Sequence, residues 1–404
     1  MTDVHDIVII GAGPAGSTLA YFLASNGLDV LLLDKAAFPR DKTCGDALSP
    51  RALHVLRKMG LFEPVRRAGF QIEKVAFYSP NGKHVTMAVP AYDNLPNFSV
   101  VMPRYKFDNI LLEHAVSANA QFQSKVNVID VMREAESIVG IRADSPDGPI
   151  EIRSRFTVIA TGAATSLLER AELLAHLPEY SRAARTYYEG VQGLSDTIEF
   201  HFDAVPLPGY GWVFPISPTA ANVGAGYYAP AGRIPTKKSP RHLLDEFISS
   251  SKVSDLLKGA RMTAPIKGYP LRFDFPKARI AFPGLGLVGE ACGLVNPLTG
   301  EGIDYALESA ETVAGFLIDV FNSSKSPQYV MEKYTQILQE RFLRTFNALI
   351  RVRDWYLRPW MLNRYVSAAL RNEEVALLLV NIGLGNIDPL KAFSLRNLVR
   401  IFWG

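Results

Sequence analysis

The sequence contains little cysteine, no long apolar run and almost no excess charge. Its 404 residues include two cysteines, Cys44 and Cys292, which are too few for the disulfide framework of a secreted protein. No apolar stretch reaches the length of about 18 residues that a bilayer requires, and the N-terminal apolar run is too short for a signal peptide. A net charge of +3 gives no argument for nucleic acid. We therefore expect a cytoplasmic protein without a nucleic-acid partner.

The histidines are few and scattered. None of the seven falls in a motif with catalytic or metal-ligand spacing, so residues such as His54 and His201 are interpreted as structural or solvated. The sequence contains no Ser-His-Asp, Walker or zinc pattern. We therefore expect no metal site.

The stretch DIVIIGAGPAGSTLA, residues 6–20, has the pattern of a strand, a turn and a helix. The short run Ile7–Ile10 is rich in β-branched residues and predicts a buried parallel strand. Apolar residues at helical spacing predict a helix from Pro14 to Asn26, and the run from Asp29 to Leu33 predicts a second strand. This order is typical of a Rossmann-type nucleotide-binding unit.

Three glycines and one acid complete this fingerprint. Gly11 suits the tight turn, Gly13 admits a pyrophosphate, and Gly16 lets the helix pack closely on the strand. Asp34 ends the second strand, where a carboxylate accepts hydrogen bonds from a ribose. The motif predicts nucleotide binding but does not separate FAD from NAD.

The rest of the chain indicates an α/β domain interrupted by a second sheet. The length exceeds what one hydrophobic core normally serves, and Asn81-Gly82 between two strand-like runs predicts a hairpin. The segment from Arg185 to Phe273 is strand-like and rich in aromatic and turn residues. We predict a nucleotide-binding domain of residues 1–75, 101–170 and 275–325, a mostly antiparallel sheet domain of residues 76–100 and 171–274, and a helical C-terminal region of residues 326–404.

A second constellation lies at residues 287–303, LVGEACGLVNPLTGEGI. A strand is expected to end at Gly289-Glu290, and Gly300 and Gly302 precede a helix that begins at Ile303. Helix N-termini concentrate N–H donors and positive potential, which suits an anionic or electron-rich group. An ordinary turn with an acidic residue is the alternative.

Together the two motifs resemble the flavin site of the p-hydroxybenzoate-hydroxylase-like flavoproteins. In that superfamily the N-terminal fingerprint holds the ADP part of FAD, and the later strand meets the ribityl chain. The acid of the later motif is usually aspartate, whereas this chain has Glu290. An Asp-Gly pair in the middle of the chain is replaced by Thr161-Gly162 in VIATGAATS. Because that pair is associated with nicotinamide nucleotide contacts, the electron donor stays open between NAD(P)H and a ferredoxin-like protein.

Within this superfamily the chain is similar to the geranylgeranyl reductase family, over residues 3 to about 320. The stretches FPRDKTCGDALSPRAL, PGYGWVFP and NPLTGEGI carry the resemblance. The family signature Tyr-x-Trp-x-Phe-Pro, which lines the lipid pocket, matches Tyr210, Trp212, Phe214 and Pro215. Strand alternation puts the three aromatic rings on one face, either as a pocket wall or as sheet core.

The resemblance implies an FAD-binding domain interleaved with a substrate-binding sheet domain. It places Cys44 beside substrate and flavin ring, where it donates a proton or shapes the pocket; nearby Lys or Arg would lower its pKa, while Cys292 is interpreted as structural. Arg104 either contacts the cofactor or forms a surface ion pair with Asp108. The implied cofactor-binding residues are Gly11, Ala12, Gly13, Pro14, Ala15, Gly16, Asp34, Lys35, Cys44, Gly45, Arg104, Thr161, Gly162, Gly289, Glu290, Pro297, Gly300, Gly302 and Ile303.

The C-terminal third bears on where the substrate resides. From Glu332 to Leu370 the pattern is helical, and arginines are mixed with Trp355 and Trp360. This mixture suits peripheral contact with the cytoplasmic face of a membrane, although most amphipathic helices cover a core.

The resemblance implies an FAD-dependent reductase that saturates carbon–carbon double bonds of a prenyl chain in lipid biosynthesis. The hydride comes from reduced flavin and is accompanied by protonation. The head group stays open between a diphosphate, phospholipid, quinone and chlorin, as does the oligomeric state. The alternatives are a flavin monooxygenase or halogenase acting on an aromatic or polyketide substrate, and a flavin-binding carrier without turnover.

Overall fold

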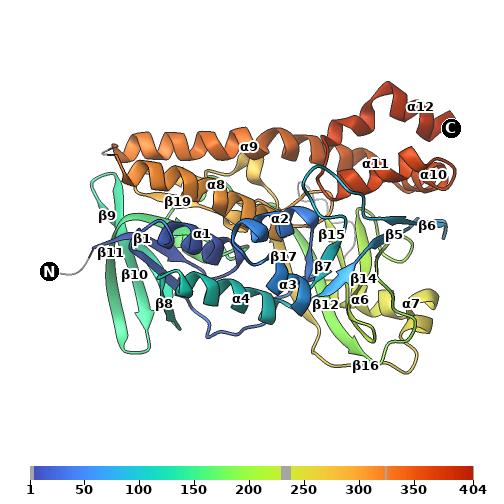
Figure 1. Cartoon of the computed structure of the whole chain (residues 1–404), viewed down its shortest axis with the longest axis horizontal. Helices are drawn as coiled ribbons and strands as arrows, with labels where there is room; N and C mark the ends of the chain where they lie inside the picture. Colours follow the sequence, from blue (N-terminus) through green and yellow to red (C-terminus); the bar gives the residue numbers. More distant parts are fainter. Residues whose placement is uncertain (1–3, 229–237, 324, 404) are drawn as a thin grey trace.

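The computed structural model describes residues 4–228, 238–323 and 325–403. Two large sheets lie one after the other along the long axis of the molecule, and the two ends of the chain lie at opposite ends of that axis (Figure 1). The α/β architecture and the helical C-terminal region are confirmed. The predicted division into three residue ranges stays a prediction.

The first sheet contains the predicted strand–turn–helix unit. Its order is β18-β19-β11-β1-β2-β8, and β1, β2, β8, β11 and β19 run parallel. The four residues Ile7–Ile10 are at most 5% exposed, as expected for a strand covered on both faces. The strands are β1 (Val4–Ile10), β2 (Val30–Asp34), β8 (Gln121–Ser124), β9 (Asn127–Glu134), β10 (Ser137–Ser145), β11 (Gly148–Ile159), β18 (Ala281–Phe282) and β19 (Leu285–Leu287).

The second sheet is antiparallel apart from one pair. Its order is β16-β12-β15-β14-β13-β5-β6, with β17 beside β12 and the pair β13–β5 parallel. The predicted hairpin at Asn81-Gly82 joins β5 and β6. The strands are β5 (Lys74–Tyr78), β6 (His84–Ala88), β12 (Tyr180–Glu189), β13 (Thr197–His201), β14 (Gly209–Ser217), β15 (Ala220–Tyr228), β16 (Arg261–Met262) and β17 (Lys267–Arg272). A small third sheet consists of β3 (Ala47–Leu48), β4 (Phe70–Ile72) and β7 (Ser99–Val101), and its strands β4 and β7 contact β14 of the second sheet.

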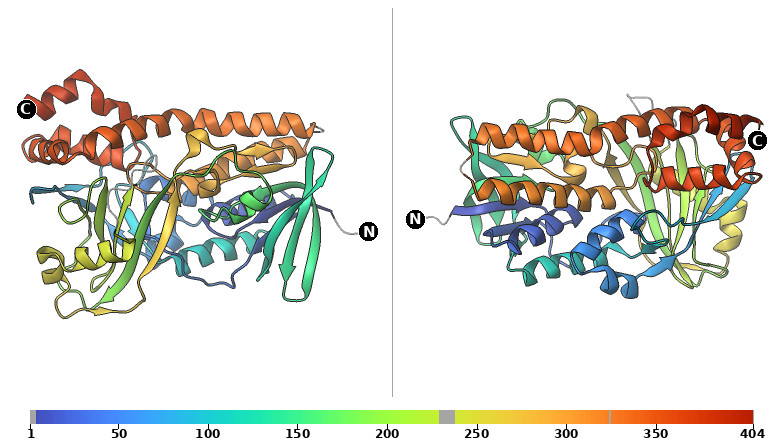
Figure 2. Two further views of the ribbon diagram at one scale, coloured as in Figure 1. Left: turned by 180° about the vertical axis from the view of Figure 1, so that it is seen from behind. Right: turned by 45° about the horizontal axis from the view of Figure 1, so that its top comes forward.

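Helix α9 spans both sheets. Its residues from Val330 to Phe346 that point inward, such as Tyr334, pack in the core of the first sheet, and Val352 and Tyr356 belong to the core of the second. Figure 2 shows this long helix running above both sheets. The helices are α1 (Pro14–Ala24), α2 (Pro50–Lys58), α3 (Phe62–Ala68), α4 (Arg104–Ser117), α5 (Ser166–Arg170), α6 (Pro240–Ile248), α7 (Ser251–Leu256), α8 (Ile303–Phe321), α9 (Pro327–Tyr356), α10 (Pro359–Ala369), α11 (Glu373–Gly383) and α12 (Leu395–Trp403).

One local expectation is wrong, and one helical pattern is confirmed but divided into two helices. The stretch predicted as strand-like up to Phe273 also contains the short helices α6 and α7, each preceded by a serine cap position. The helical pattern from Glu332 to Leu370 is divided, because Pro359 has no N–H for a continuous helix and instead starts α10.

The two faces of the second sheet are covered differently. On one face Val213 and Val223 pack against Phe247 of α6. On the other face Trp212 and Phe214 share a core cluster with residues of α9, α10 and α11. The C-terminal helices therefore roof the face that carries the predicted aromatic residues.

Candidate active site

One continuous cavity of about 530 Å³ connects the two sheets. It begins at the turn after β1, passes the loop of residues 40–46 and the start of α8, and ends beneath the C-terminal helices. Its volume falls within the range of about 300–1,000 Å³ that is usual for small-molecule sites. A dinucleotide end and an apolar end are thus parts of one space.

The turn after β1 is shaped by close backbone approach. Gly11 has a φ of +108°, and a Cβ there would lie 2.5 Å from the carbonyl oxygen of Ala160. A Cβ on Gly16 would lie 1.8 Å from the Gly11 oxygen, so both positions require glycine to fold. Gly13 differs, because the nearest atom to its Cβ position is Arg40 Nη2 at 3.5 Å. The space above Gly13 is open toward the cavity and fits a pyrophosphate.

Asp34 lines the cavity beside this turn. Its Oδ2 accepts a hydrogen bond of 2.8 Å from the Ala12 N–H, and its Oδ1 accepts one of 2.8 Å from the Ala36 N–H. Each carboxylate oxygen can accept a further bond, so the group can still hold a ribose hydroxyl. Lys35 lines the cavity next to it, and Arg40 Nη2 lies 4.0 Å from Asp34 Oδ2.

The second predicted loop meets the first across the cavity. Glu290 accepts a hydrogen bond of 3.1 Å from Lys42 Nζ and one of 3.2 Å from the Arg272 N–H, so both of its oxygens already have protein partners. Thr161 takes the place of the acid of the Asp-Gly pair, so this position carries a hydroxyl and no carboxylate. Its Oγ1 donates to the Ala164 carbonyl at 3.0 Å.

Most of the predicted cofactor-binding residues line this cavity, whereas four do not. Gly289 packs against α1, because its Cβ position lies 2.9 Å from the Ala15 side chain. Gly16 supports the turn from behind, as its Cβ position shows. Ala12 contributes its N–H to Asp34, and Pro297 lies in the turn outside the lining. The lining residues are Gly11, Gly13, Pro14, Ala15, Asp34, Lys35, Cys44, Gly45, Arg104, Thr161, Gly162, Glu290, Gly300, Gly302 and Ile303.

Tyr210, Trp212 and Phe214 form an aromatic wall of the cavity. Trp212 lies against Gly224 and donates its Nε1–H to Asn222 Oδ1 at 2.9 Å, which fixes the indole. Tyr210 donates its hydroxyl to the Thr299 carbonyl and so contacts the loop before α8. Pro215 is outside the lining, since strand alternation points it to the face opposite Phe214.

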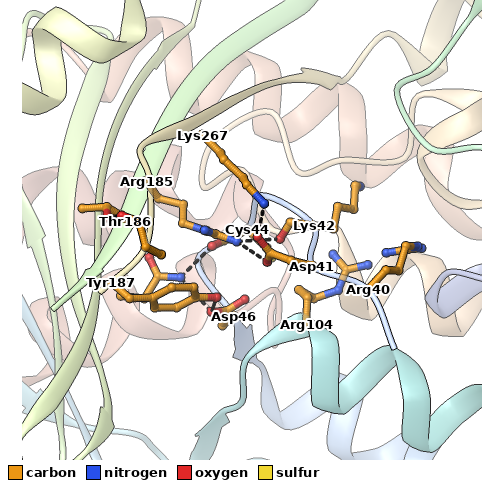
Figure 3. A network of polar contacts seen from close by, with 12 residues as sticks. Arg40, Asp41, Lys42, Cys44, Asp46, Arg104, Arg185, Thr186, Tyr187 and Lys267 are labelled. Carbon is orange, nitrogen blue, oxygen red and sulfur yellow. Dashed lines mark hydrogen bonds and ion pairs between the residues drawn. The ribbon is translucent and has the colours of Figure 1, made fainter. Parts of the chain in front are cut away.

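The loop of residues 40–46 is held against the second sheet by charged contacts (Figure 3). Asp41 accepts hydrogen bonds from Arg185 Nη2 at 2.5 Å and from Lys267 Nζ at 2.8 Å. Opposite charges hold the pKa of Asp41 below its usual value, even though burial acts to raise it. Gly45 lies so close to the wall that a Cβ would be 2.9 Å from Phe214.

Cys44 is half-buried and its accessible part faces the cavity. Burial raises the pKa of its thiol, and the opposing effects of Arg104 and Lys42 are smaller. The expectation that neighbouring cations would lower this pKa is therefore wrong in its net direction. The thiol keeps its proton at neutral pH. Cys292, in contrast, is fully buried in the core of the first sheet.

Arg104 forms the ion pair with Asp108, but not at the surface. Its Nε and Nη2 lie 2.6 and 2.8 Å from the two oxygens of Asp108, and both side chains are buried. Arg40 Nη1 lies 3.0 Å from the same carboxylate. The guanidinium also interacts with Cys44 and lines the cavity. The pair thus holds a positive charge beside the thiol.

Three residues of the site were not predicted. Asp46 and Asn222 form a buried hydrogen-bonded pair with a distance of 2.8 Å, although 176 residues separate them. Glu301 lines the cavity, and burial next to Asp304 raises the pKa of its carboxyl well above the usual value. Asp46 lies in FPRDKTCGDALSPRAL and Glu301 in NPLTGEGI, so membership of these motifs is the sequence signal that could have identified both residues. Nothing in the sequence marks Asn222.

Two further features bear on chemistry and location. In the part of the chain that the structure describes, no group of three or more His, Cys, Asp or Glu side chains could hold a metal ion. Among the same residues no helix has the length and apolar character needed to cross a membrane.

The sequence comparisons give an FAD binding domain and relatives named as reductases. The family model of the FAD binding domain matches residues 4–185. A menaquinone reductase of Mycobacterium tuberculosis is 30% identical over 325 residues, which cover 78% of this chain and 77% of that protein. Digeranylgeranylglycerophospholipid reductase 1 of Methanopyrus kandleri is 29% identical over 350 residues, covering 85% of this chain and 88% of that protein.

Solved structures share the fold over almost the whole chain. A geranylgeranyl bacteriochlorophyll reductase-like protein of Thermoplasma acidophilum gives a TM-score of 0.82 at 24% identity, covering 97% of this chain and 98% of that one. A flavin-dependent brominase gives a TM-score of 0.75 at 20% identity, covering 98% of each chain. At such identities these structures show the fold alone. With the cavity geometry and the sequence relatives, we conclude that the chain belongs to the geranylgeranyl reductase family of FAD-dependent oxidoreductases.

Proposed function

We propose that this protein saturates carbon–carbon double bonds of a prenyl chain with electrons from bound FAD. The observation that carries the proposal is the continuity of the cavity. One space joins the open turn at Gly13 to the aromatic wall and to apolar residues of α9–α11, such as Val352 and Leu379. An isoprenoid is long and apolar and so suits the second part, and the relatives' names support a lipid-type substrate.

Different parts of the cavity would hold different parts of the cofactor. The Gly13 turn would receive the pyrophosphate, Asp34 the ribose, and the loop before α8 the ring system, with helix N–H donors nearby. Reduced FAD supplies a hydride when bound. The protein then has to position the double bond, exclude water and hold a proton.

The aromatic wall and Cys44 perform these three tasks in the proposed reaction. Tyr210, Trp212 and Phe214 present apolar rings that exclude water and orient the prenyl chain. An isolated double bond has no carbonyl to accept electron density, so hydride arrival has to be partnered by protonation. We assign the proton to Cys44 Sγ; the alternative role of this side chain is to shape the pocket. Arg104 stabilises the thiolate that proton donation would leave.

The fold is also that of a flavin-dependent brominase, so oxygen-dependent chemistry is the second candidate. Purified holoenzyme should be reduced and incubated with prenyl diphosphates, prenylated quinones and archaeal-type phospholipid precursors, and the products analysed by mass spectrometry. Reduction predicts a gain of two hydrogens per double bond. Incorporation of oxygen or halogen would contradict the proposal. Flavin that no prenyl acceptor reoxidises would indicate a carrier.

The same purified holoenzyme can be used to identify the electron donor. We propose either NAD(P)H or a ferredoxin-like protein, because Thr161 stands where relatives often carry the acid of the Asp-Gly pair. Loss of the oxidised-flavin absorbance after mixing with NADPH or NADH supports direct reduction. Reduction by a ferredoxin alone supports the protein donor.

Peripheral contact of the C-terminal helices with a cytoplasmic membrane face is proposed as the route of substrate entry. Trp355 and Trp360 are 48% and 51% exposed, and Leu395 is 79% exposed. Arg358 lies beside Trp355, with its guanidinium carbon 5.7 Å from the ring centroid. Exposed aromatic and basic groups at one end of the molecule suit an anionic lipid surface. Failure to sediment with anionic vesicles at low salt would contradict this.

A further inference from the structure

Tyr228 is a buried tyrosine whose hydroxyl is left unpaired in the cavity. The residue is 3% exposed and lines the cavity, and within the described residues its hydroxyl has no hydrogen-bond partner. Most buried polar groups in native structures are hydrogen-bonded, so each exception needs an explanation. The free hydroxyl marks a place where a ligand can supply the missing acceptor.

Strand alternation turns Tyr228 to the same face of β15 as Asn222. Between them on this face stand Gly224 and Gly226, and a Cβ on Gly224 would lie 1.9 Å from the Trp212 indole. The two glycines leave room where β14 carries the aromatic wall, and Gly226 lines the cavity. Tyr228 is thus the next side chain beyond the wall, at the point where β15 ends.

The Tyr228 hydroxyl meets the loop before α8. A Cβ on Gly300 would lie 3.1 Å from the Tyr210 hydroxyl oxygen and 3.4 Å from the Tyr228 hydroxyl oxygen, so both groups converge on one point of this loop. Tyr210 already donates its proton to the Thr299 carbonyl. Tyr228 is therefore the member of this pair whose proton is free, next to the loop that is proposed to receive the ring system of the cofactor.

The charges around this point do not suit an anion. Glu301 follows Gly300 and lines the cavity, and its Oε1 has no hydrogen-bond partner among the described residues. A carboxyl there, protonated or ionised, gives an anionic ligand no counter-charge. Arg353 lies over the Tyr228 ring, with 5.9 Å between the guanidinium carbon and the ring centroid, but it is outside the cavity lining and is ion-paired with Asp354 at 2.9 Å. A neutral acceptor oxygen is the group that fits.

We propose that the Tyr228 hydroxyl donates a hydrogen bond to a neutral oxygen in the head group of the prenyl substrate. This inference rests on the proposed function, in which the cavity holds a prenyl chain. The oxygen is a quinone carbonyl or the ether oxygen of a glycerol lipid, because both are uncharged acceptors and both lie close to the first isoprene unit. A buried diphosphate would need a counter-charge that the residues described around this point do not offer. Tyr228 determines specificity for the head group, while the aromatic wall holds the chain.

The test measures binding to the oxidised holoenzyme, so that no turnover is needed. Four probes share one geranylgeranyl chain and differ at its end: a 1,4-naphthoquinone, a glycerol ether, a diphosphate, and the hydrocarbon without a head group. Binding is followed by the change in the flavin absorbance spectrum. In Tyr228→Phe the Kd of the naphthoquinone or of the glycerol ether should rise about fivefold, as expected for one lost neutral hydrogen bond, and the Kd of the hydrocarbon should stay unchanged.

The pattern across the probes identifies the oxygen. A loss for the naphthoquinone alone assigns the carbonyl, a loss for the glycerol ether alone assigns the ether oxygen, and a loss for both assigns any neutral acceptor at this position. An equal loss for the hydrocarbon would mean that only ring packing changed and would overturn the inference. A loss for the diphosphate as large as for the neutral probes would also overturn it. Unchanged Kd values for every probe would leave water as the partner of the hydroxyl, with the same consequence.

Two controls locate the hydrogen bond. Tyr365 is also buried, lines the cavity and has a hydroxyl without a partner among the described residues, but it lies on α10, where its ring packs against Tyr356. Tyr365→Phe should leave the Kd differences among the probes unchanged, and an effect equal to that of Tyr228→Phe would overturn the inference. The midpoint potential of the flavin should be the same in Tyr228→Phe and the parent. A shifted potential with unchanged probe binding would assign the hydroxyl to a flavin carbonyl instead.

Turnover separates this inference from the proposed function. With a probe that the parent enzyme reduces, Tyr228→Phe should raise KM and keep kcat within about twofold, because the lost hydrogen bond holds the head group and not the reacting carbons. A lower kcat with unchanged KM would overturn the inference. If the parent enzyme reduces none of the probes, the proposed function fails, while the Kd comparison still decides whether Tyr228 binds a neutral oxygen.

Discussion

The two ends of the cavity are built in different ways. At the dinucleotide end, Gly11, Gly13 and Asp34 come from one short strand–helix–strand segment, and Ala12 reaches Asp34 across 22 residues. At the aromatic end, Asp46 comes from a loop, Tyr187 from β12 and Asn222 from β15, and 141 and 176 residues separate the hydrogen-bonded pairs. The first end is a local structure, whereas the second exists only after the two sheets and the C-terminal helices have packed.

This difference predicts that substitutions separate the two ends cleanly. A change at the dinucleotide end should remove the cofactor and leave the fold. A change at the aromatic end should leave the cofactor and remove the reaction. Each prediction below tests one side of this separation.

The largest expected effect is the loss of flavin in Gly13→Val. The protein itself has room for the new side chain, because the nearest atom to the Cβ position is 3.5 Å away and the backbone conformation is ordinary. The valine would occupy the space for the pyrophosphate, so the purified protein should be colourless but folded. Absorbance spectra and circular dichroism measure the two properties. Gly315→Val, on α8 where no atom lies within 4 Å, should stay yellow. A yellow Gly13→Val protein would place the cofactor elsewhere.

The next effect compares the two faces of β14. Trp212→Ala should retain flavin and lose about 100-fold in turnover, because the prenyl chain is no longer oriented against the wall. Val213→Ala changes the neighbouring residue, which packs against α6 on the opposite face, and should cost about 1–3 kcal/mol of stability with near-normal turnover. Flavin content, kcat and urea unfolding distinguish them. A colourless Trp212→Ala protein would identify the ring as core.

The same contrast explains what could be predicted from the sequence. Gly11, Gly16 and Asp34 were identifiable because their constraints are local: a turn, a close approach and the end of a strand. The aromatic residues of β14 were identified through period-two alternation and family resemblance. Alternation also accounts for Pro215, which shares the signature but points away from the cavity.

The unpredicted features depend on tertiary packing. The net pKa of Cys44 follows from burial, which a sequence does not reveal, so the nearby cations gave the wrong direction. Asn222 became part of the site because β15 pairs with β14 and brings its amide to Trp212 and Asp46. Arg104 and Asp108 have the spacing of a surface pair, but α4 turns that face inward.

A smaller effect concerns how stability depends on pH. The pKa of folded Asp46 is about 6, above its usual value of 3.8, so the folded state binds this proton more tightly than the unfolded chain. The associated stabilisation is complete below about pH 4 and is lost as the pH rises through about 6, a change of about 3 kcal/mol. Urea unfolding across this range should show a flatter profile for Asp46→Asn than for the parent. Asp93→Asn, at an exposed site, should keep the parental profile.

The smallest effect on the folded enzyme should come from the C-terminal surface, which belongs to neither end of the cavity. Trp355→Ser with Trp360→Ser removes two exposed rings, and stability should change by at most about 1 kcal/mol in total, with flavin content unchanged. Binding to anionic vesicles should nevertheless fall several-fold, because interfacial aromatic contacts are lost while the arginines remain. Leu177→Ser offers the control, since Leu177 is 85% exposed but follows α5 near the first sheet. Unchanged vesicle binding in the tryptophan variant, or an equal loss in Leu177→Ser, would mean that the C-terminal helices only roof the cavity and that the prenyl chain enters without a membrane contact at this surface.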